Sequence, residues 1–345
     1  MKRRNILKSA AAAALAFGLL PSTALAQEVT LRLHQFLPAP ATVPKHILKP
    51  WATAVEELAG GKLKIEHFDA MALGGKPPGL MDQAIDGVAD IVMTVVGYTP
   101  GRFPQTEVFE LPFMMTSPVA TSKAFQSLVE TDLQDGEYKD VKVLGAWVHG
   151  PGVIHTATGV SKLEDLEGLK VRGPTRVIND MLQELGAIPV GLPLPAIPEA
   201  LSKGVVSGTV IPWEVTPAIK LSELVTHHTE FVGDEAFYTA TIVLVMNKAK
   251  YDSLPDDVRA AIDAESGQKL SEMAATVMWG KDAPGRAIAD DAGNTIIQLP
   301  EAEVARFKEK SQPVIDRWVS EMDAKGIDGR ALIDTAKGLI KEHGG

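Results

Sequence analysis

The sequence contains no cysteine among its 345 residues. This absence excludes disulfide cross-links, a cysteine nucleophile and the lipid-modified cysteine on which a bacterial lipoprotein anchor is built. A chain without disulfides must be held together by its hydrophobic core. With 45% apolar side chains over this length, the sequence can supply the cores of two packed domains.

The sequence also lacks the motifs of common enzyme classes. It has no P-loop and no G-x-S-x-G elbow, and the similar stretch GVVSG at 204–208 carries its serine one place late. His227 and His228 lack the i, i+4 spacing by which two helix histidines share a metal ion. We therefore predict no catalytic residue, no metal site and no cofactor.

Positive charge is scarce, with 34 Lys and Arg against 44 Asp and Glu. Loss of the first 26 residues would remove four basic side chains and leave 30 against 44, a net charge of about −14. Such a chain is repelled by nucleic acids and by anionic membrane surfaces, so we predict no partner of either kind. An anion-binding protein with this charge needs a local cationic group.

The amino end has the three parts of an export signal. Basic residues between Lys2 and Lys8 precede an apolar stretch at 10–20, and Ala24-Leu25-Ala26 supplies a small-x-small cleavage pattern. The apolar stretch is too short to span a bilayer well, and no later stretch is long and apolar enough. We predict a signal peptide over residues 1–26, cleaved after Ala26, and a free periplasmic protein. Arg3-Arg4 leaves both the general secretory and the twin-arginine route open.

From residue 29 onward, strand and helix patterns alternate in the rhythm of α/β domains with parallel sheets. The continuous apolar run at 91–96 is typical of a strand buried on both faces. Further strands are predicted at 29–34, 63–67, 141–148, 153–156, 169–172, 188–192, 205–211, 226–231 and 239–246. Helices are predicted at 46–58, 80–85, 119–133, 177–185, 197–202, 255–291 (interrupted near Pro284-Gly285), 301–322 and 330–342.

The pattern predicts two domains with a ligand cleft between them, at the carboxyl ends of their strands. The first domain comprises residues 27–149 plus about 239–280, and the second residues 150–238 plus about 281–345. The chain first crosses between them at His149-Gly150-Pro151-Gly152, which breaks the preceding strand.

Arg172 is the candidate anchor for an acidic ligand. It ends the predicted strand at 169–172, Gly173-Pro174 breaks that strand, and Thr175 can cap a helix beginning near Arg176. A guanidinium at the carboxyl end of a strand, beside free helix N–H groups, suits a planar anion such as a carboxylate. The alternative role of Arg172 is an ordinary salt bridge.

Several motifs, in this order, resemble those of the solute-binding receptors of tripartite ATP-independent periplasmic (TRAP) transporters. They are LGG at 73–75, ELPF at 110–113, DLEGLKVR at 165–172, LGAIPV at 185–190, ALSKGVV at 200–206 and DSLP at 252–255. The resemblance implies a periplasmic binding protein-like fold of two α/β domains that share a long helix. It also implies closure around an organic acid and its delivery to integral membrane permease subunits. Arg172 occupies the position of the family's arginine that pairs bidentately with the substrate carboxylate.

The sequence departs from the family pattern at several ligand positions. Ile211 stands where an asparagine commonly helps to hold the carboxylate, Ala196 and Pro198 replace a glutamate and a tyrosine, and residues 151–153 lack a second arginine. These departures predict a more apolar pocket with one strong ionic anchor. The predicted ligand is therefore a monocarboxylate with an apolar or aromatic body.

Further ligand contacts are predicted at strand ends that face the cleft. Trp213 could stack on a substrate ring, although a tryptophan there is as often simply buried. The remaining candidates are Gln35, Phe36, Thr94, Tyr98, His149, Ile211 and Phe237.

The sequence thus predicts a monomeric periplasmic receptor for an organic acid. Two alternatives remain open at this point. One is a receptor for another type of importer, such as an ATP-driven system. The other, from a different class, is an extracytoplasmic enzyme that acts on a small carboxylate.

Overall fold

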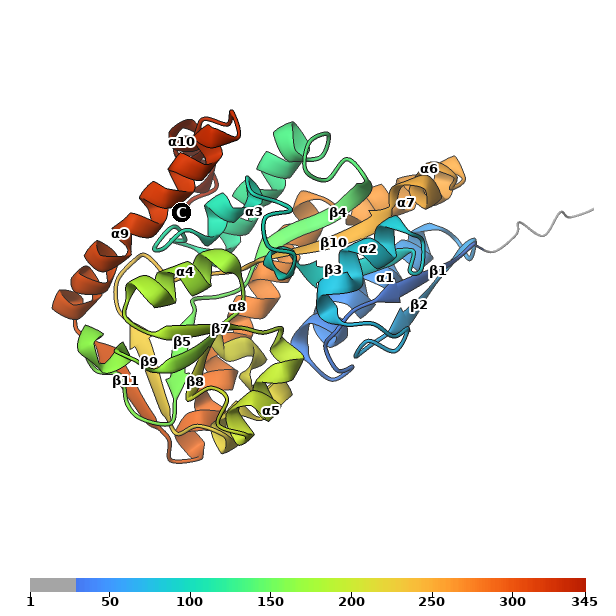
Figure 1. The fold of residues 1–345 in the computed structure, drawn as a ribbon. Helices are drawn as coiled ribbons and strands as arrows, with labels where there is room; N and C mark the ends of the chain where they lie inside the picture. Colours follow the sequence, from blue (N-terminus) through green and yellow to red (C-terminus); the bar gives the residue numbers. More distant parts are fainter. Residues whose placement is uncertain (1–28) are drawn as a thin grey trace, which may run out of the picture.

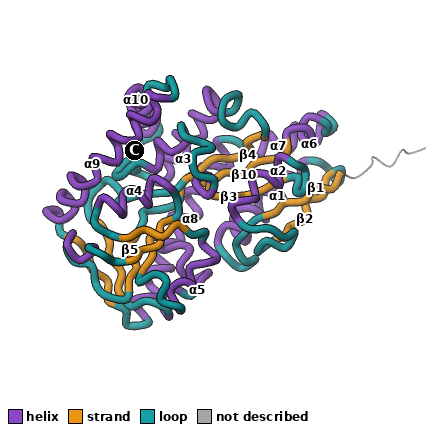
Figure 2. The backbone as a smooth tube through the Cα atoms, in the orientation of Figure 1, coloured by secondary structure: helices purple, strands orange, loops and turns teal. Residues whose placement is uncertain are grey.

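The computed structural model describes residues 29–345, so the predicted signal peptide lies outside the described residues. The chain forms two α/β units, each built around one β-sheet, arranged along the long axis of the molecule (Figure 1). The sheets have five and six strands, and Figure 2 shows them as two separate groups wrapped by helices and loops. The predicted α/β fold with two sheets is confirmed.

The first sheet has the strand order β2-β1-β3-β10-β4. β1 pairs in parallel with β2 and β3, whereas β10 runs antiparallel to β3 and β4. All five residues of β3 are buried, as the unbroken apolar run predicted. The strands are β1 (Val29–His34), β2 (Leu63–Phe68), β3 (Ile91–Val95), β4 (Val141–Val148) and β10 (Thr241–Asn247).

Five helices cover the first sheet or its ends (Figure 1). They are α1 (Lys49–Leu58), α2 (Leu80–Ile85), α3 (Pro118–Leu128), α6 (Lys248–Asp252) and α7 (Asp256–Glu265). Pro50 lies early in α1, which directly continues a π-helical turn at Pro44–Leu48. α3 begins with a cap, because the Ser117 hydroxyl accepts a hydrogen bond from the Ala120 N–H.

The second sheet has the strand order β11-β9-β5-β8-β6-β7. β6 pairs in parallel with β7 and β8, β9 in parallel with β11, and β5 runs antiparallel to β8 and β9. The edge strand β11 was not predicted, and its residues are mostly half-buried or exposed. The strands are β5 (Val153–Thr156), β6 (Lys170–Gly173), β7 (Ile188–Gly191), β8 (Gly208–Ile211), β9 (His227–Phe231) and β11 (Thr295–Leu299). Two helices, α4 (Arg176–Glu184) and α5 (Ile197–Ser202), belong to the same unit.

Two extended segments connect strands of the two sheets. Residues 149–152 lead from β4 into β5, and residues 232–240 lead from β9 into β10. The two segments are hydrogen-bonded to each other, since the Gly152 N–H donates to the Tyr238 carbonyl at 2.9 Å and the Thr239 hydroxyl to the His149 carbonyl at 2.8 Å. They therefore form one paired connection between the sheets.

The 24-residue helix α8 (Gln268–Asp291) packs against both units. A Cβ added to Gly145 of β4 would meet Leu270 at 2.7 Å, and one added to Gly285 would meet the Trp213 carbonyl at 2.2 Å. The predicted interruption near Pro284-Gly285 is wrong, because α8 continues through it. Pro284 lacks an N–H for the helical ladder, yet the residues on both sides of it stay helical. The break lies instead at Gly267, which has φ +64°.

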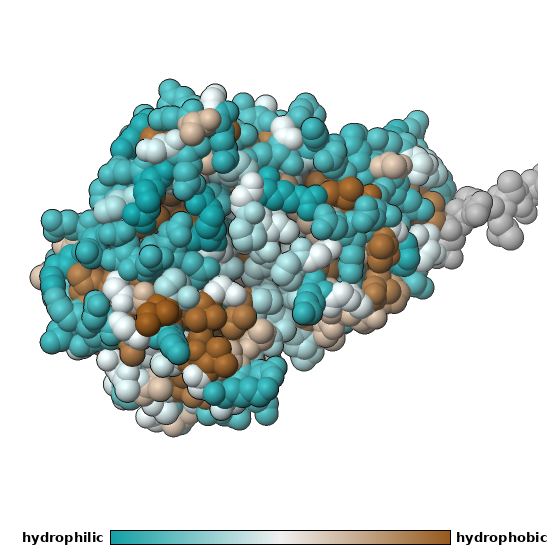
Figure 3. Space-filling model, in the orientation of Figure 1, coloured by the Kyte–Doolittle hydropathy of each residue, from teal (hydrophilic) through white to brown (hydrophobic). Residues whose placement is uncertain are grey.

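Helices α9 (Glu301–Ala324) and α10 (Gly329–Glu342) complete the chain. α9 packs on α4 of the second unit, and α10 packs on α3 of the first (Figure 1). Hydrophilic residues cover most of the face shown in Figure 3, with an apolar patch on the second unit. Within residues 29–345, no helix has both the length and the apolar content needed to cross a lipid bilayer.

Candidate ligand-binding site

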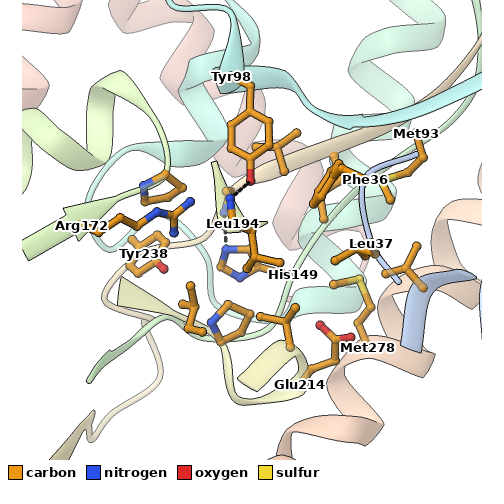
Figure 4. Close-up of a pocket in the computed structure, with 18 residues that line it drawn as sticks. Phe36, Leu37, Met93, Tyr98, His149, Arg172, Leu194, Glu214, Tyr238 and Met278 are labelled. Atoms are coloured by element: carbon orange, nitrogen blue, oxygen red, sulfur yellow. Dashed lines mark hydrogen bonds between the residues drawn. The ribbon is translucent and has the colours of Figure 1, made fainter. Parts of the chain in front are cut away.

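A cavity lies between the two units, where parallel strands of both sheets have their carboxyl ends (Figure 4). The cavity is narrow in this structure, with a volume of about 60 Å³ open to the centres of water-sized spheres. Both units, the segments between them and α8 line this cavity. The first unit contributes Phe36, Leu37, Val43, Met93, Val95 and Tyr98, and the second contributes Arg172, Pro174, Leu194, Ile211, Pro212, Glu214 and Val215. The connecting segments and β10 contribute His149, Tyr238, Ala240 and Ile242, and α8 contributes Met278.

Arg172 is the one arginine or lysine of this lining. Its side chain extends from β6, and the residue is only 1% exposed. Nε donates to the Leu192 carbonyl at 2.7 Å and Nη1 to the Val210 carbonyl at 3.2 Å, which fixes the plane of the guanidinium. Among residues 29–345, no Asp or Glu forms an ion pair with Arg172, and Nη2 has no backbone acceptor.

Arg172 carries a positive charge in this buried position. Burial lowers the pKa of its guanidinium, an effect that Tyr98 and Tyr238 oppose, but arginine remains protonated in proteins. A buried cation without an anionic partner is strongly unfavourable. The cavity is therefore electrostatically incomplete, and an anion placed at Arg172 would complete it.

Two phenol groups lie beside Arg172 (Figure 4). The Leu194 N–H donates to the Tyr98 oxygen at 3.0 Å, which leaves the Tyr98 hydroxyl proton free for another acceptor. The Tyr238 hydroxyl is buried and has no hydrogen-bond partner in the described chain. Burial raises the pKa of both phenols, so both are neutral donors at neutral pH. A guanidinium and two phenols suit an acceptor-only group such as a carboxylate.

His149 lines the cavity, but both of its ring nitrogens are hydrogen-bonded to backbone groups. Nδ1 donates to the Gly150 carbonyl at 2.5 Å, and Nε2 accepts from the Ala240 N–H at 3.0 Å. Burial lowers the pKa of His149 to about 4, so the ring is neutral at neutral pH. His149 thus fixes the paired connection between the units and offers the cavity the face of its ring.

The rest of the lining is mainly apolar, and it includes three further predicted contact residues, Phe36, Tyr98 and Ile211. Phe36 packs against Tyr98 with ring centroids 5.6 Å apart and a tilt of 58°, and Ile211 contributes an aliphatic wall. Together with Arg172 and His149, these residues form the part of the predicted site that the structure brings together.

The other four predicted residues lie outside this cavity. The Thr94 hydroxyl lies 3.4 Å from the Val95 carbonyl, while its strand neighbours Met93 and Val95 face the cavity. The Gln35 amide is bonded to the Leu37 carbonyl and to Asp69. Phe237 stacks on Phe231 at 4.2 Å, and the Trp213 indole donates to Glu230.

Several lining residues were not among the predicted contacts. Tyr238 and Glu214 each directly follow a residue that was chosen, Phe237 and Trp213. Leu37 and Met278 belong to a loop and to α8, and nothing in their local sequence distinguishes them from core residues. Among residues 29–345, no group of three or more His, Asp or Glu side chains is placed to hold a metal ion.

The two units also meet beside the cavity. Arg176 of α4 pairs with the buried Glu107 of the first unit, and it lies 2.8 Å from Glu321 of α9. A Cβ added to Gly97 would lie 2.4 Å from the Thr175 side chain. Within the first unit, Glu110 accepts hydrogen bonds from the N–H and hydroxyl of Thr241 at 2.9 and 2.6 Å. The units are therefore in direct contact around the cavity.

The buried Glu110 carboxyl should make the stability of the protein depend on pH. Burial raises its pKa from 4.5 to about 7. Between these values the unfolded chain has lost a proton that the folded chain keeps, so the free energy of unfolding falls as pH rises, by about 3 kcal/mol from this group. Glu110→Gln mimics the neutral carboxyl. We expect its melting temperature, relative to wild type, to rise between pH 5 and pH 8 in ligand-free protein. An equal difference at both pH values would contradict a raised pKa.

Comparison with known proteins agrees with this geometry. Residues 35–321 match the family model described as bacterial extracellular solute-binding protein, family 7. A TRAP solute-binding protein from Rhodoferax ferrireducens, solved with copurified benzoate, is 49% identical, with a TM-score of 0.90 over 91% of this chain and 98% of that one.

Two further relatives cover nearly the whole chain. A marine metagenome TRAP solute-binding protein specific for aromatic acids, solved with 3-hydroxybenzoate, is 46% identical, with a TM-score of 0.90 over 92% of this chain and 100% of that one. The C4-dicarboxylate-binding periplasmic protein of Rhodobacter capsulatus is 24% identical over 95% of this chain and 97% of its own. The predicted resemblance is confirmed: the chain belongs to family 7 of the bacterial extracellular solute-binding proteins, the substrate-binding receptors of TRAP transporters.

Proposed function

We propose that this protein binds an aromatic monocarboxylate, closes around it and delivers it to a TRAP permease. One observation carries the proposal: Arg172 is buried without an ion-pair partner among residues 29–345, beside two phenols in an otherwise mainly apolar cavity. One anionic group and one apolar body match this distribution of polar and apolar lining. A second carboxylate would meet Glu214 or apolar walls.

The relatives support the aromatic part of the proposal. The two structures with 49% and 46% identity contain benzoate and 3-hydroxybenzoate, and a relative from Bordetella bronchiseptica, 28% identical, contains mandelate. All three ligands join one carboxylate to one benzene ring. The C4-dicarboxylate-binding relative is only 24% identical, so it argues less strongly for its own ligand.

The proposed movement is a hinge closure of two domains. The first comprises residues 27–149 plus about 239–280, and the second residues 150–238 plus about 281–345. The paired connection at residues 149–152 and 232–240 is the hinge, and the ligand stabilises the closed form through contacts that only this form provides. We also propose a monomer, exported to the periplasm after cleavage at Ala26.

The proposal excludes chemical turnover of the ligand. The cavity lining contains no serine, threonine, cysteine or lysine, and both ring nitrogens of His149 are bonded to the backbone. Benzoate incubated with the protein should be recovered unchanged. A product detected by liquid chromatography, and absent with the heat-inactivated protein, would favour the enzyme alternative.

Thermal unfolding tests the ligand class. A ligand that binds only the folded protein adds about 2.7 kcal/mol of stability at 100 times its Kd. We expect benzoate and related aromatic monocarboxylates to raise the melting temperature by several degrees, and succinate to leave it unchanged. Stabilisation by dicarboxylates or sugar acids alone would contradict the proposal.

A further inference from the structure

Glu214 is a second polar group of the cavity. It follows β8 in a short 3-10 helix, Trp213–Ile219, and it is only 5% exposed. Figure 4 shows its carboxyl group near Met278 and Leu37, on the side of the cavity away from Arg172. Any ligand that holds its carboxylate at Arg172 and fills the cavity would direct its other end towards Glu214.

The Glu214 carboxyl has few partners within the described chain. No Lys, Arg or His among residues 29–345 pairs with it, and the Thr42 hydroxyl is the polar side chain that stabilises its charged form. The nearby Asp282 is also acidic, and its Oδ1 accepts the Glu214 backbone N–H at 2.8 Å. The other residues at this end, such as Val43, Val215 and Met278, offer no polar atoms suited to a carboxyl group.

The surroundings favour a neutral carboxyl group. Burial, with a smaller contribution from Asp282, raises the pKa of Glu214 to about 8. A protonated carboxyl both donates and accepts a hydrogen bond, and a ligand hydroxyl has the same two capacities. The Thr42 hydroxyl can serve one oxygen of the Glu214 carboxyl. A buried polar atom left without a partner is unfavourable, so the ligand that best fits this end supplies a partner for the other oxygen.

We propose that Glu214 selects aromatic monocarboxylates that carry a hydroxyl group on the ring, at the meta or para position away from the carboxylate. This inference rests on the proposed function, since it needs the carboxylate to be held at Arg172. It makes Glu214 the specificity-determining residue of the distal end, separate from the anchoring role of Arg172.

Pairs of ligands with nearly equal volume isolate the hydrogen bond. A methyl group fills about the same space as a hydroxyl but cannot satisfy the Glu214 carboxyl. Sites that hydrogen-bond a ligand hydroxyl discriminate strongly against analogues without it, because the polar groups of the site are then left unpaired. The informative quantity is therefore the affinity ratio of hydroxybenzoate to methylbenzoate at the same ring position.

The test is isothermal titration calorimetry at pH 7 with 3- and 4-hydroxybenzoate and with 3- and 4-methylbenzoate. We expect wild type to prefer the hydroxyl ligand at least about tenfold at one of the two positions. Glu214→Gln, which keeps a donor and an acceptor, should retain most of that preference. Glu214→Met, of similar length and apolar, should abolish it while still binding the methyl ligand.

Two results would overturn the inference. One is a wild type that binds each methyl ligand as tightly as its hydroxyl counterpart, which would leave the proposed function intact if binding is tight. The other is a preference that survives unchanged in Glu214→Met. If Glu214→Met fails to fold, as judged by thermal unfolding, the wild-type ratios and the Gln variant decide. Failure of wild type to bind any of the four acids would instead contradict the proposed function, and the inference with it.

Discussion

Arg172→Met is expected to weaken benzoate binding by at least two orders of magnitude. The ligand carboxylate would enter a mainly apolar, buried site without its cationic partner, which costs on the order of 3–5 kcal/mol by analogy with truncated buried ion pairs. The Tyr98 and Tyr238 hydroxyls would remain as neutral donors and could not replace the charge. Calorimetric titration of the folded variant with benzoate measures the loss.

Arg317→Met is the matched control. It removes the same charge from the protein, but Arg317 lies half exposed on α9 and pairs with Glu184. Exposed pairs contribute little, so benzoate affinity should be unchanged. Undiminished affinity in Arg172→Met, or an equal loss in both variants, would contradict the anchoring role of Arg172.

Gly97→Ala is expected to weaken ligand binding by roughly 5- to 150-fold, since overpacking costs about 1–3 kcal/mol. The added Cβ would lie 2.4 and 2.5 Å from the Cγ2 and Cβ atoms of Thr175. Gly97 belongs to the first unit, and the buried Thr175 precedes α4 of the second. The clash thus arises only where the two units meet, so the alanine opposes closure rather than folding.

Two measurements separate closure from folding. Calorimetry with benzoate should show the weaker binding of Gly97→Ala, while the ligand-free melting temperature changes little. Gly79→Ala is the control in the same unit, because a Cβ there meets nothing within 4 Å. If Gly97→Ala bound benzoate as tightly as wild type, the contact at Thr175 would not belong to the ligand-bound form.

The fold was largely predictable because its signals are local. The buried run of β3 and the end of β6 at Gly173 are visible in apolar patterns and in breaking residues. α8 was harder, because Pro284-Gly285 is a typical helix-breaking pair and the local pattern does not show the packing of Gly285 against the Trp213 carbonyl. β11 was missed because a half-exposed edge strand has a weak apolar pattern.

The sequence predicted which strand ends reach the cavity, but not which residue at each of them lines it. Thr94 was chosen where Met93 and Val95 face the cavity, and Phe237 where Tyr238 does. In β3, adjacent side chains point to opposite faces of the strand, so an error of one residue at Thr94 exchanges a cavity-lining residue for one that faces away. Phe237 and Tyr238 lie in the connecting segment, where no such alternation guides the choice. Which face meets the cavity depends on how the two units pack, and the chain carries no local signal for that. Arg172, chosen because charge, strand end and family position agreed, does line the cavity.

The crystal structure of the complex with benzoate tests the anchoring of an aromatic acid most directly. We predict the carboxylate oxygens within about 3 Å of Arg172 Nη2 and of the Tyr238 hydroxyl, with the ring between Phe36 and Met278. A carboxylate bound elsewhere in the cavity, with the Arg172 guanidinium still unpaired, would contradict it.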